Sequence, residues 1–390
     1  TGSTVGGITG NAPTGSSIKD CTNKASITGA GDAVGGIVGS SAGTTISRCF
    51  NTGAVSNTKV STSYYNTGGI AGSHASGTIS SCVNTGTVSS SLKRTGGIAG
   101  VLGGKVEASC NTGIINGTYG VGGIAGEITN KSAEIYNCYN RGSITGTGIN
   151  NSDTSSNFGV GGVVGGLGSI SANCTISVQN CYSTGTVSAE ITGLYTGGIV
   201  GNGQLKKGSY TASIIAENCW YLNSSASNDD EEADGITALT EQQIKNKEFD
   251  KVYGEDGWSI GEDGYPYFTW QDPNATYKVT FNVKPEDAKI VVKDSSNKTV
   301  DPESDGTYRL KNGTYTYEVT ADEYKTKTGS FTVAYSGQSI SVSLDIQKYD
   351  YVFTTDPEDA KLTVKSGDDV QKSLADGRTY QLAKKGNPYR

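Results

Sequence analysis

The residue types that most enzymes use for catalysis are scarce in this chain. Its 390 residues include a single histidine, His74, and no methionine, whereas cysteine occurs eight times. One histidine excludes a zinc site with two histidine ligands and the HExxH motif of metalloproteases. We expect His74 itself to lie solvated in a loop rather than to bind a ligand. The sequence therefore predicts no catalytic residue, no metal site and no cofactor.

The acidic residues of the first half form no column. Residues 1–220 contain eight Asp or Glu and eleven Lys or Arg, whereas residues 221–390 contain 30 and 20. β-Helical polysaccharide lyases and hydrolases need paired carboxylates or a calcium-binding acidic cluster on one face. An enzyme is therefore the alternative interpretation and not the preferred one. The shift in charge after residue 220 marks a domain boundary.

The other binding motifs are weak. Gly120, Gly122 and Ala125 fit a loose dinucleotide-binding fingerprint, but no helical pattern follows them. Neither half is basic enough for nucleic-acid binding. No apolar run approaches the ~18 residues of a membrane-spanning helix. The sequence thus indicates neither nucleic-acid binding nor membrane insertion.

A repeat with two anchors dominates residues 1 to about 225. The string Gly-Gly-(Ile/Val)-x-Gly begins at Gly6, Gly35, Gly68, Gly96, Gly122, Gly161 and Gly197. One cysteine follows each string, and these seven are Cys21, Cys49, Cys82, Cys110, Cys138, Cys181 and Cys219. Only Cys174 lies outside the pattern. Paired anchors in constant order indicate a protein built from stacked repeats.

Each repeat unit is expected to contain three short strands. They centre on the Gly-Gly string, on the aliphatic residue three before the cysteine, and on the one six after it. The Cys110 unit has one residue deleted in this interpretation, so that Ile115 takes the last of these places. Short β-branched runs between Gly and Asn favour strands and turns over helices. Stacking them predicts an all-β fold, a parallel β-helix with three faces and about seven coils.

Two columns of side chains follow from this stacking. We expect the cysteine column to be buried and unbridged, because in-register side chains cannot easily reach the disulfide torsion. The sequence leaves open whether Cys174 forms a disulfide with Cys181. The position after the cysteine is aromatic in four coils: Phe50, Tyr139, Tyr182 and Trp220. Either this column points outward as a ligand-contact platform, or a bulge or covering loops bury it.

The chain beyond the repeat contains a cap segment and a second kind of module. Residues 228–272 combine the acidic run 229–232 with a capping box at Thr240 and Gln243, which predicts a helix over roughly 241–251. This aromatic-rich segment suits the open end of a solenoid. Pro285–Lys289 recurs as Pro357–Lys361. We expect an antiparallel Ig-like β-sandwich over 273–348 and a truncated second copy over 349–390.

The repeat resembles the GLUG-motif family, which is marked by Gly-Gly-Ile-Ala-Gly and by a Cys-x-Asn-x-Gly-x-Val string. The resemblance covers the predicted solenoid, residues 1–227, and departs from the family pattern at Cys110 and after Cys219. The later modules look Ig-like or PEGA-like. The resemblance implies a β-helical region of a large bacterial surface protein. Such repeats also occur in streptococcal immunoglobulin A peptidases, although the peptidase motif is missing from this chain.

The function expected from the sequence is that of a non-catalytic stalk or adhesin region, extracellular and at the bacterial cell surface. The solenoid would present a binding face to a glycan or to a host or bacterial surface protein, with the sandwiches as spacers. The alternatives are a polysaccharide-active β-helix enzyme, either lyase or hydrolase, and a non-catalytic region of a secreted surface peptidase.

Overall fold

The structure is a computed structural model. It describes residues 3–383 except 60–64, 149–158, 169, 171, 192–193, 208–209, 227–234, 247–256, 273, 336, 359 and 367–368. The chain divides into two compact units, one formed by residues 1–253 and 260–266 and the other by residues 254–259 and 267–390. The first unit holds the sequence repeat and the second holds the later modules.

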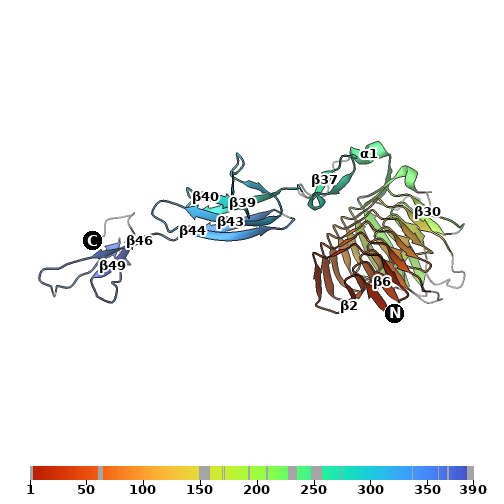
Figure 1. Cartoon of the computed structure of the whole chain (residues 1–390), viewed down its shortest axis with the longest axis horizontal. Coiled ribbons are helices and arrows are strands. Elements are labelled where there is room, and N and C mark those ends of the chain that lie inside the picture. Colours follow the sequence, from red (N-terminus) through yellow and green to blue (C-terminus); the bar gives the residue numbers. More distant parts are fainter. Residues whose placement is uncertain are drawn as a thin grey trace. The chain divides into compact units, whose positions relative to one another are not determined.

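The repeat region is a parallel β-helix of seven coils, as predicted (Figure 1). Its strands stack into five sheets, A to E, which follow one another around each coil. Sheet A contains β1 (Thr4–Gly6), β6 (Ala33–Gly35), β11 (Asn66–Gly68), β16 (Thr95–Gly96), β21 (Val121–Gly122), β26 (Gly159–Gly161) and β31 (Tyr195–Gly197). Sheet B contains β2 (Thr9–Ala12), β7 (Val38–Ser41), β12 (Ala71–His74), β17 (Ala99–Leu102), β22 (Ala125–Ile128), β27 (Val164–Leu167) and β32 (Val200–Asn202).

The other three sheets complete each coil. Sheet C contains β3 (Ser17–Lys19), β8 (Thr44–Ser47), β13 (Gly77–Ser80), β18 (Lys105–Glu107), β23 (Glu134–Tyr136), β28 (Cys174–Gln179), β34 (Tyr210–Glu217) and the antiparallel β33 (Gln204–Lys207). Sheet D contains β4 (Thr22–Asn23), β9 (Phe50–Asn51), β14 (Val83–Asn84), β19 (Cys110–Asn111), β24 (Tyr139–Asn140), β29 (Tyr182–Ser183), β35 (Cys219–Leu222) and β36 (Ile236–Leu239). Sheet E contains β5 (Ile27–Gly29), β10 (Val55–Asn57), β15 (Val88–Ser90), β20 (Ile115–Gly117), β25 (Ile144–Gly146) and β30 (Val187–Ala189).

A coil therefore has five strands where the sequence predicts three. The Gly-Gly string does not form one strand, because the chain bends within it: β6 ends at Gly35 and β7 begins at Val38. The residue after the cysteine begins a further short strand, β9 in the second coil. The second bend falls on the residue just before the cysteine, which adopts the left-handed conformation without being glycine: φ is 50° at Arg48 and 52° at Ser81.

Sheets A and B meet along a seam of glycines. A Cβ atom on Gly35 would lie 2.7 Å from the backbone nitrogen of Gly72, and one on Gly39 would lie 2.6 Å from that of Val5. Equivalent glycines of the other strings are equally crowded by backbone. The string therefore has glycine at these positions because the two sheets approach each other backbone to backbone, which leaves no room for a side chain.

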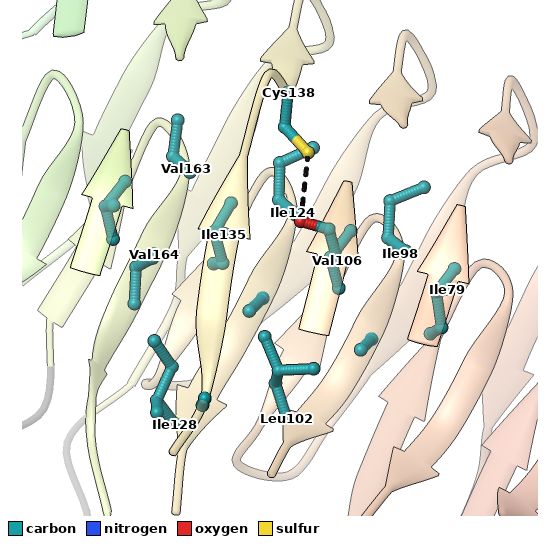
Figure 2. Packing of buried hydrophobic residues seen from close by; sticks show 14 of the residues in the cluster. Ile79, Ile98, Leu102, Val106, Ile124, Ile128, Ile135, Cys138, Val163 and Val164 are labelled. Atoms are coloured by element: carbon teal, nitrogen blue, oxygen red, sulfur yellow. Dashed lines mark hydrogen bonds between the residues drawn. The ribbon is translucent and has the colours of Figure 1, made fainter. Parts of the chain in front are cut away.

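Most buried apolar side chains of the described coils belong to one of two separate cores. The larger core holds residues of sheets B, C and D, and Figure 2 shows its columns, among them Val106 and Ile135 of sheet C and Ile98, Ile124 and Val163 from the Gly-Gly bends. The smaller core holds a different set from sheets A and E. Its fully buried members include Val34, Val55, Val88, Val121 and Ile144. Each coil thus contributes to both cores, and stacking buries them continuously.

A ladder of buried asparagines runs through the first five coils. The side-chain amide Nδ2 of each asparagine donates to Oδ1 of the next, at 2.7–2.8 Å, through Asn23, Asn51, Asn84, Asn111 and Asn140. The last of these donates to Ser183 at 3.2 Å. Each asparagine packs against the second glycine of a string, as where a Cβ on Gly36 would lie 2.5 Å from Cγ of Asn51. The ladder satisfies polar groups that would otherwise be costly to bury.

The segment after the last coil contains one short helix. The helix α1 (Glu241–Lys245) has the predicted capping box: the Thr240 nitrogen donates to Oε1 of Gln243 at 2.8 Å, and the Gln243 nitrogen donates to Oγ1 of Thr240 at 3.3 Å. The helix ends at Lys245, with Asn246 as its C-cap, whereas the prediction extended it to about 251. Residues 247–251 lie outside the described residues, as does the acidic run 229–232. The remaining elements here are η1 (Asn223–Ser225), β37 (Trp258–Ile260), β38 (Pro266–Phe268) and η2 (Thr269–Gln271).

The second unit contains the predicted small β-modules. A three-stranded sheet in the order β42, β39, β45 faces a four-stranded sheet in the order β41, β40, β43, β44, around buried residues such as Val279 and Val292. Their bounds are β39 (Tyr277–Lys284), β40 (Lys289–Lys293), β41 (Thr299–Val300), β42 (Tyr308–Leu310), β43 (Gly313–Thr320), β44 (Lys327–Val333) and β45 (Gln338–Ser343). The expectation of antiparallel pairing fails at β39 and β45, which are parallel because the last strand returns beside the first.

The residues of the second copy form two small antiparallel sheets. One pairs β46 (Lys348–Val352) with β49 (Thr379–Ala383), and the other pairs β47 (Lys365–Ser366) with β48 (Asp369–Val370). Their buried apolar residues are Val364, Tyr380 and Leu382. A core of this size is small beside that of the first copy, which has two buried clusters.

Candidate functional site

The cysteine column lies inside the solenoid. The side chains of Cys49, Cys82, Cys138, Cys181 and Cys219 are fully buried, and Cys21 of the first coil is half-buried. The sulfur of Cys138 lies 3.3 Å from the Tyr136 carbonyl oxygen and 3.8 Å from that of Val106, a contact drawn in Figure 2. Burial raises the pKa of the Cys82 thiol. All eight cysteines, Cys174 included, are free thiols in the structure.

Cys110 does not belong to this column. The strand register pairs Cys110 with Val83 and Tyr139, which places it in the column that follows the cysteines. Ser109 occupies the cysteine position, where its Oγ donates to the Glu107 carbonyl oxygen at 2.8 Å. Counted from Ser109, Ile115 stands six residues on, so nothing is deleted. The prediction was wrong because the spacing was counted from the wrong small residue.

The aromatic column is covered rather than open to solvent. The side chains of Tyr182, Tyr139 and Trp220 are 0, 2 and 6% exposed, and Phe50 is half-buried. The rings of Tyr139 and Tyr182 stack with centroids 5.1 Å apart. The Tyr182 hydroxyl donates to the carbonyl oxygen of Pro266. Of the two arrangements left open by the sequence, the structure has the covered one, so these residues are not a ligand-contact platform.

Residues 260–266, which we call the strap, reach this column at Tyr182. Arg141, the residue after β24, makes an ion pair with Asp263 of the strap, and its guanidinium lies 4.9 Å from the centroid of the Tyr265 ring. Lys245 approaches the same ring at 4.8 Å. Partial burial acts to raise the pKa of Asp263, but the hydrogen bond from Arg141 brings it below its ordinary value. The strap is thus held to the solenoid by charge as well as by packing.

His74 is buried, contrary to the expectation of a solvated loop residue. It is the last residue of β12, in register with Ser41 and Leu102, and its side chain is fully buried. Its Nδ1 lies 2.8 Å from Oγ of Ser41. Burial lowers the pKa of His74 to about 4, so the ring is neutral at pH 7. The turn that the sequence suggested begins one residue later, and this explains the error.

The outer face of sheet C is open. Two columns of side chains point outward from it, because alternate residues of a strand face opposite sides. One column contains Ser17, Thr45, Thr78, Lys105, Glu134, Ser177 and Ile215. The other contains Lys19, Ser47, Ser80, Glu107, Tyr136, Gln179 and Glu217, of which Ser47 is buried.

A shallow hollow of about 320 Å³ lies on this face. It is lined by Lys105, Glu134, Ile135, Tyr136, Ser177 and Gln179. Nζ of Lys105 lies 2.8 Å from Oε2 of Glu107 and 5.8 Å from the centroid of the Tyr136 ring. The hydrogen bond to Glu107 raises the pKa of Lys105, which therefore stays charged. Sequence reasoning missed this hollow because polar residues on alternate strand positions look like any solvated face.

The acids of the solenoid are less scattered than the sequence suggested. Glu107, Glu134 and Glu217 share the outer face of sheet C, where the amide of Gln179 donates to Glu217 at 2.8 Å. Glu127 is fully buried and paired with Arg94. Within the described residues, no three His, Cys, Asp or Glu side chains gather as a metal site would require. No helix among these residues is long and apolar enough to cross a membrane.

One coil of the repeat matches a known sequence motif. Residues 117–145 match the GLUG motif, and this stretch runs from the end of β20 to β25, one full coil. A solved structure from Bacteroides ovatus, provisionally described as an immunoglobulin A1 protease, is 19% identical with a TM-score of 0.43, covering 68% of this chain and 87% of that one. No curated protein sequence matches the chain. The chain therefore carries a GLUG motif at residues 117–145, in one coil of a parallel β-helix whose other coils repeat the same glycine pattern.

Proposed function

We propose that this chain is a non-catalytic, extracellular contact region of a larger bacterial cell-surface protein. The solenoid presents the binding face and the β-sandwich modules act as spacers. The observation that carries the proposal is the open outer face of sheet C, with its hollow around Tyr136, on a scaffold whose aromatic column on sheet D is covered.

The scaffold favours a contact role for this face. Its side chains stand on strands that are paired on both sides and anchored by fully buried residues such as Val106 and Ile135, whose alternate neighbours point outward. Side chains on rigid strands hold fixed positions and lose little conformational entropy on binding. A shallow surface of mixed polar and aromatic residues suits recognition of an extended partner more than enclosure of a small substrate.

The same face argues against catalysis. Hydrolysis of a glycosidic bond uses two carboxyl groups that flank the bond, one of which its surroundings keep protonated. Glu134 is exposed, and Glu107 is half-buried beside the ammonium of Lys105. These carboxylates therefore lie on a wet surface instead of in a cleft. The GLUG-motif match supports the assignment to a surface protein, because such repeats occur in proteins of that class.

An array experiment tests the proposal. The fluorescently labelled full chain is applied to arrays of glycans and surface proteins, and the same glycans are assayed for new reducing ends. We expect binding to at least one component without release of reducing ends. Absence of binding throughout would contradict the contact role, and steady release of reducing ends would contradict the non-catalytic assignment.

A further inference from the structure

We infer that the hollow on sheet C is a subsite for an uncharged glycan chain. This inference rests on the proposed contact role of the solenoid and names the class of ligand. The hollow joins an exposed ring, Tyr136, to polar groups on three neighbouring strands, Lys105, Glu134, Ser177 and Gln179.

The chemistry of these side chains matches that of a sugar ring. The Tyr136 side chain is 36% exposed, so part of its ring offers a flat apolar surface to a ligand. A pyranose has an apolar C–H face and hydroxyl groups around its rim. The C–H face packs well on an aromatic ring. The sugar hydroxyl groups can form hydrogen bonds with the carboxylate of Glu134, the hydroxyl of Ser177 and the amide of Gln179.

The apolar contact continues beyond the hollow. Ile215 follows Ser177 in the same outward column, and its side chain is 55% exposed. A chain that runs along the columns therefore meets an aliphatic surface two coils after Tyr136. The hollow of about 320 Å³ is at the small end of ligand sites, so it accounts for one part of a longer ligand.

The charge at the hollow selects against acidic glycans. The carboxylates of Glu107 and Glu134 flank the ammonium of Lys105, and a third carboxylate, that of Glu217, lies two strands beyond Glu134. Lys105 is already 2.8 Å from Glu107, so an incoming sulfate or uronate would have to compete with that pair. A polyanion would also meet the two other carboxylates, and like charges brought together on binding cost affinity. Neutral sugars avoid both penalties.

Affinity electrophoresis of the full chain tests the inference. The probes are soluble mixed-linkage β-glucan, glucomannan and starch as uncharged chains, with polygalacturonate as the acidic one. Tyr136→Ser removes the ring from the hollow, and Tyr195→Ser is the matched control, because Tyr195 is 56% exposed on sheet A. We expect one uncharged probe to retard the wild-type chain, a loss of at least about tenfold in affinity for Tyr136→Ser, and no change for Tyr195→Ser.

Thermal unfolding of each variant shows that it is folded, and Gln179→Ala provides a second variant in the hollow. Retention of polygalacturonate alone, binding to none of the uncharged probes, or unchanged affinity in both hollow variants would overturn the inference. Each of these results leaves the contact role standing if the arrays show any bound partner, so the two proposals fail separately.

Discussion

At the scale of single residues, two tyrosines on neighbouring sheets differ in burial: Tyr182 is covered and Tyr136 is exposed. Tyr182 of sheet D is fully buried beneath the strap, stacked on Tyr139 and hydrogen-bonded to Pro266. Tyr136 of sheet C has no such cover and lies at the hollow. The two tyrosines are therefore expected to differ in kind, one contributing to stability and the other to recognition.

Replacing Tyr182 by serine tests its contribution to stability. We expect Tyr182→Ser to lower the free energy of unfolding by about 3–5 kcal/mol, because it leaves a cavity and removes the partner of the Pro266 carbonyl. Tyr195→Ser, at an exposed position, should change it by less than about 0.5 kcal/mol. Denaturant unfolding of the full chain measures both. Equal losses of unfolding free energy in Tyr182→Ser and Tyr195→Ser would show that the strap does not bury Tyr182.

His74 predicts a dependence of stability on pH. The unfolded chain binds a proton at this ring below its ordinary pKa of 6.5, whereas the folded ring stays neutral down to about 4. Stability is therefore present above pH 6.5 and is lost as the pH falls toward 4, by at most about 3 kcal/mol. The difference in unfolding free energy between wild type and His74→Gln, measured from pH 7 to pH 4, should follow this curve. Parallel pH profiles for the two chains would contradict it.

At the scale of elements, the glycine strings define the solenoid. They let sheets A and B meet along their backbones, and their second glycines make room for the asparagine ladder. Both features are repeated in each of the first five coils, so the stacking of coils is specified by backbone contact as well as by the two cores.

One glycine of the seam provides a direct test. A Cβ on Gly68 would overlap the carbonyl oxygen of Ala71 and lie 2.8 Å from the nitrogen of Gly100, so we expect Gly68→Ala to cost at least about 3 kcal/mol. Gly203→Ala is the control, since the nearest atom to its Cβ is 3.4 Å away, at Val200. Thermal unfolding compares the two. Similar melting temperatures would mean that the sheets can separate to admit a side chain.

The sequence predicted the elements better than their roles. Periodic glycine and cysteine indicate stacked coils, and Ile46 or Val55 mark strands by their regular offset from Cys49. The seam was not predicted, because a missing side chain gives no sign of what it approaches. Ser109 and Cys110 were confused because either small residue fits the column. The hollow was not predicted because it exists only on a sheet that no other segment covers, and contacts between residues distant in sequence determine which sheet that is.

At the scale of the whole molecule, the solenoid and the later modules are separate compact units. Ile98 is fully buried in the larger core of the solenoid, and Val342 is 2% exposed in the sandwich. Aspartate at either position buries a charge and should cost more than about 3 kcal/mol. We expect Ile98→Asp to shift only the calorimetric transition of the solenoid, and Val342→Asp only that of the sandwich. A shift of both transitions in each variant would show a single cooperative unit.

The central claim is that the solenoid makes the contact and the sandwiches space it. Its most direct test is the affinity of three full chains for the array component that the wild type binds most tightly, measured by surface plasmon resonance. Lys105→Ala changes the hollow on sheet C, and Lys293→Ala makes the same change at a half-buried strand position of the sandwich. The account predicts that Lys105→Ala weakens binding at least about fivefold while Lys293→Ala leaves it unchanged. Weakened binding for Lys293→Ala with none for Lys105→Ala would contradict it.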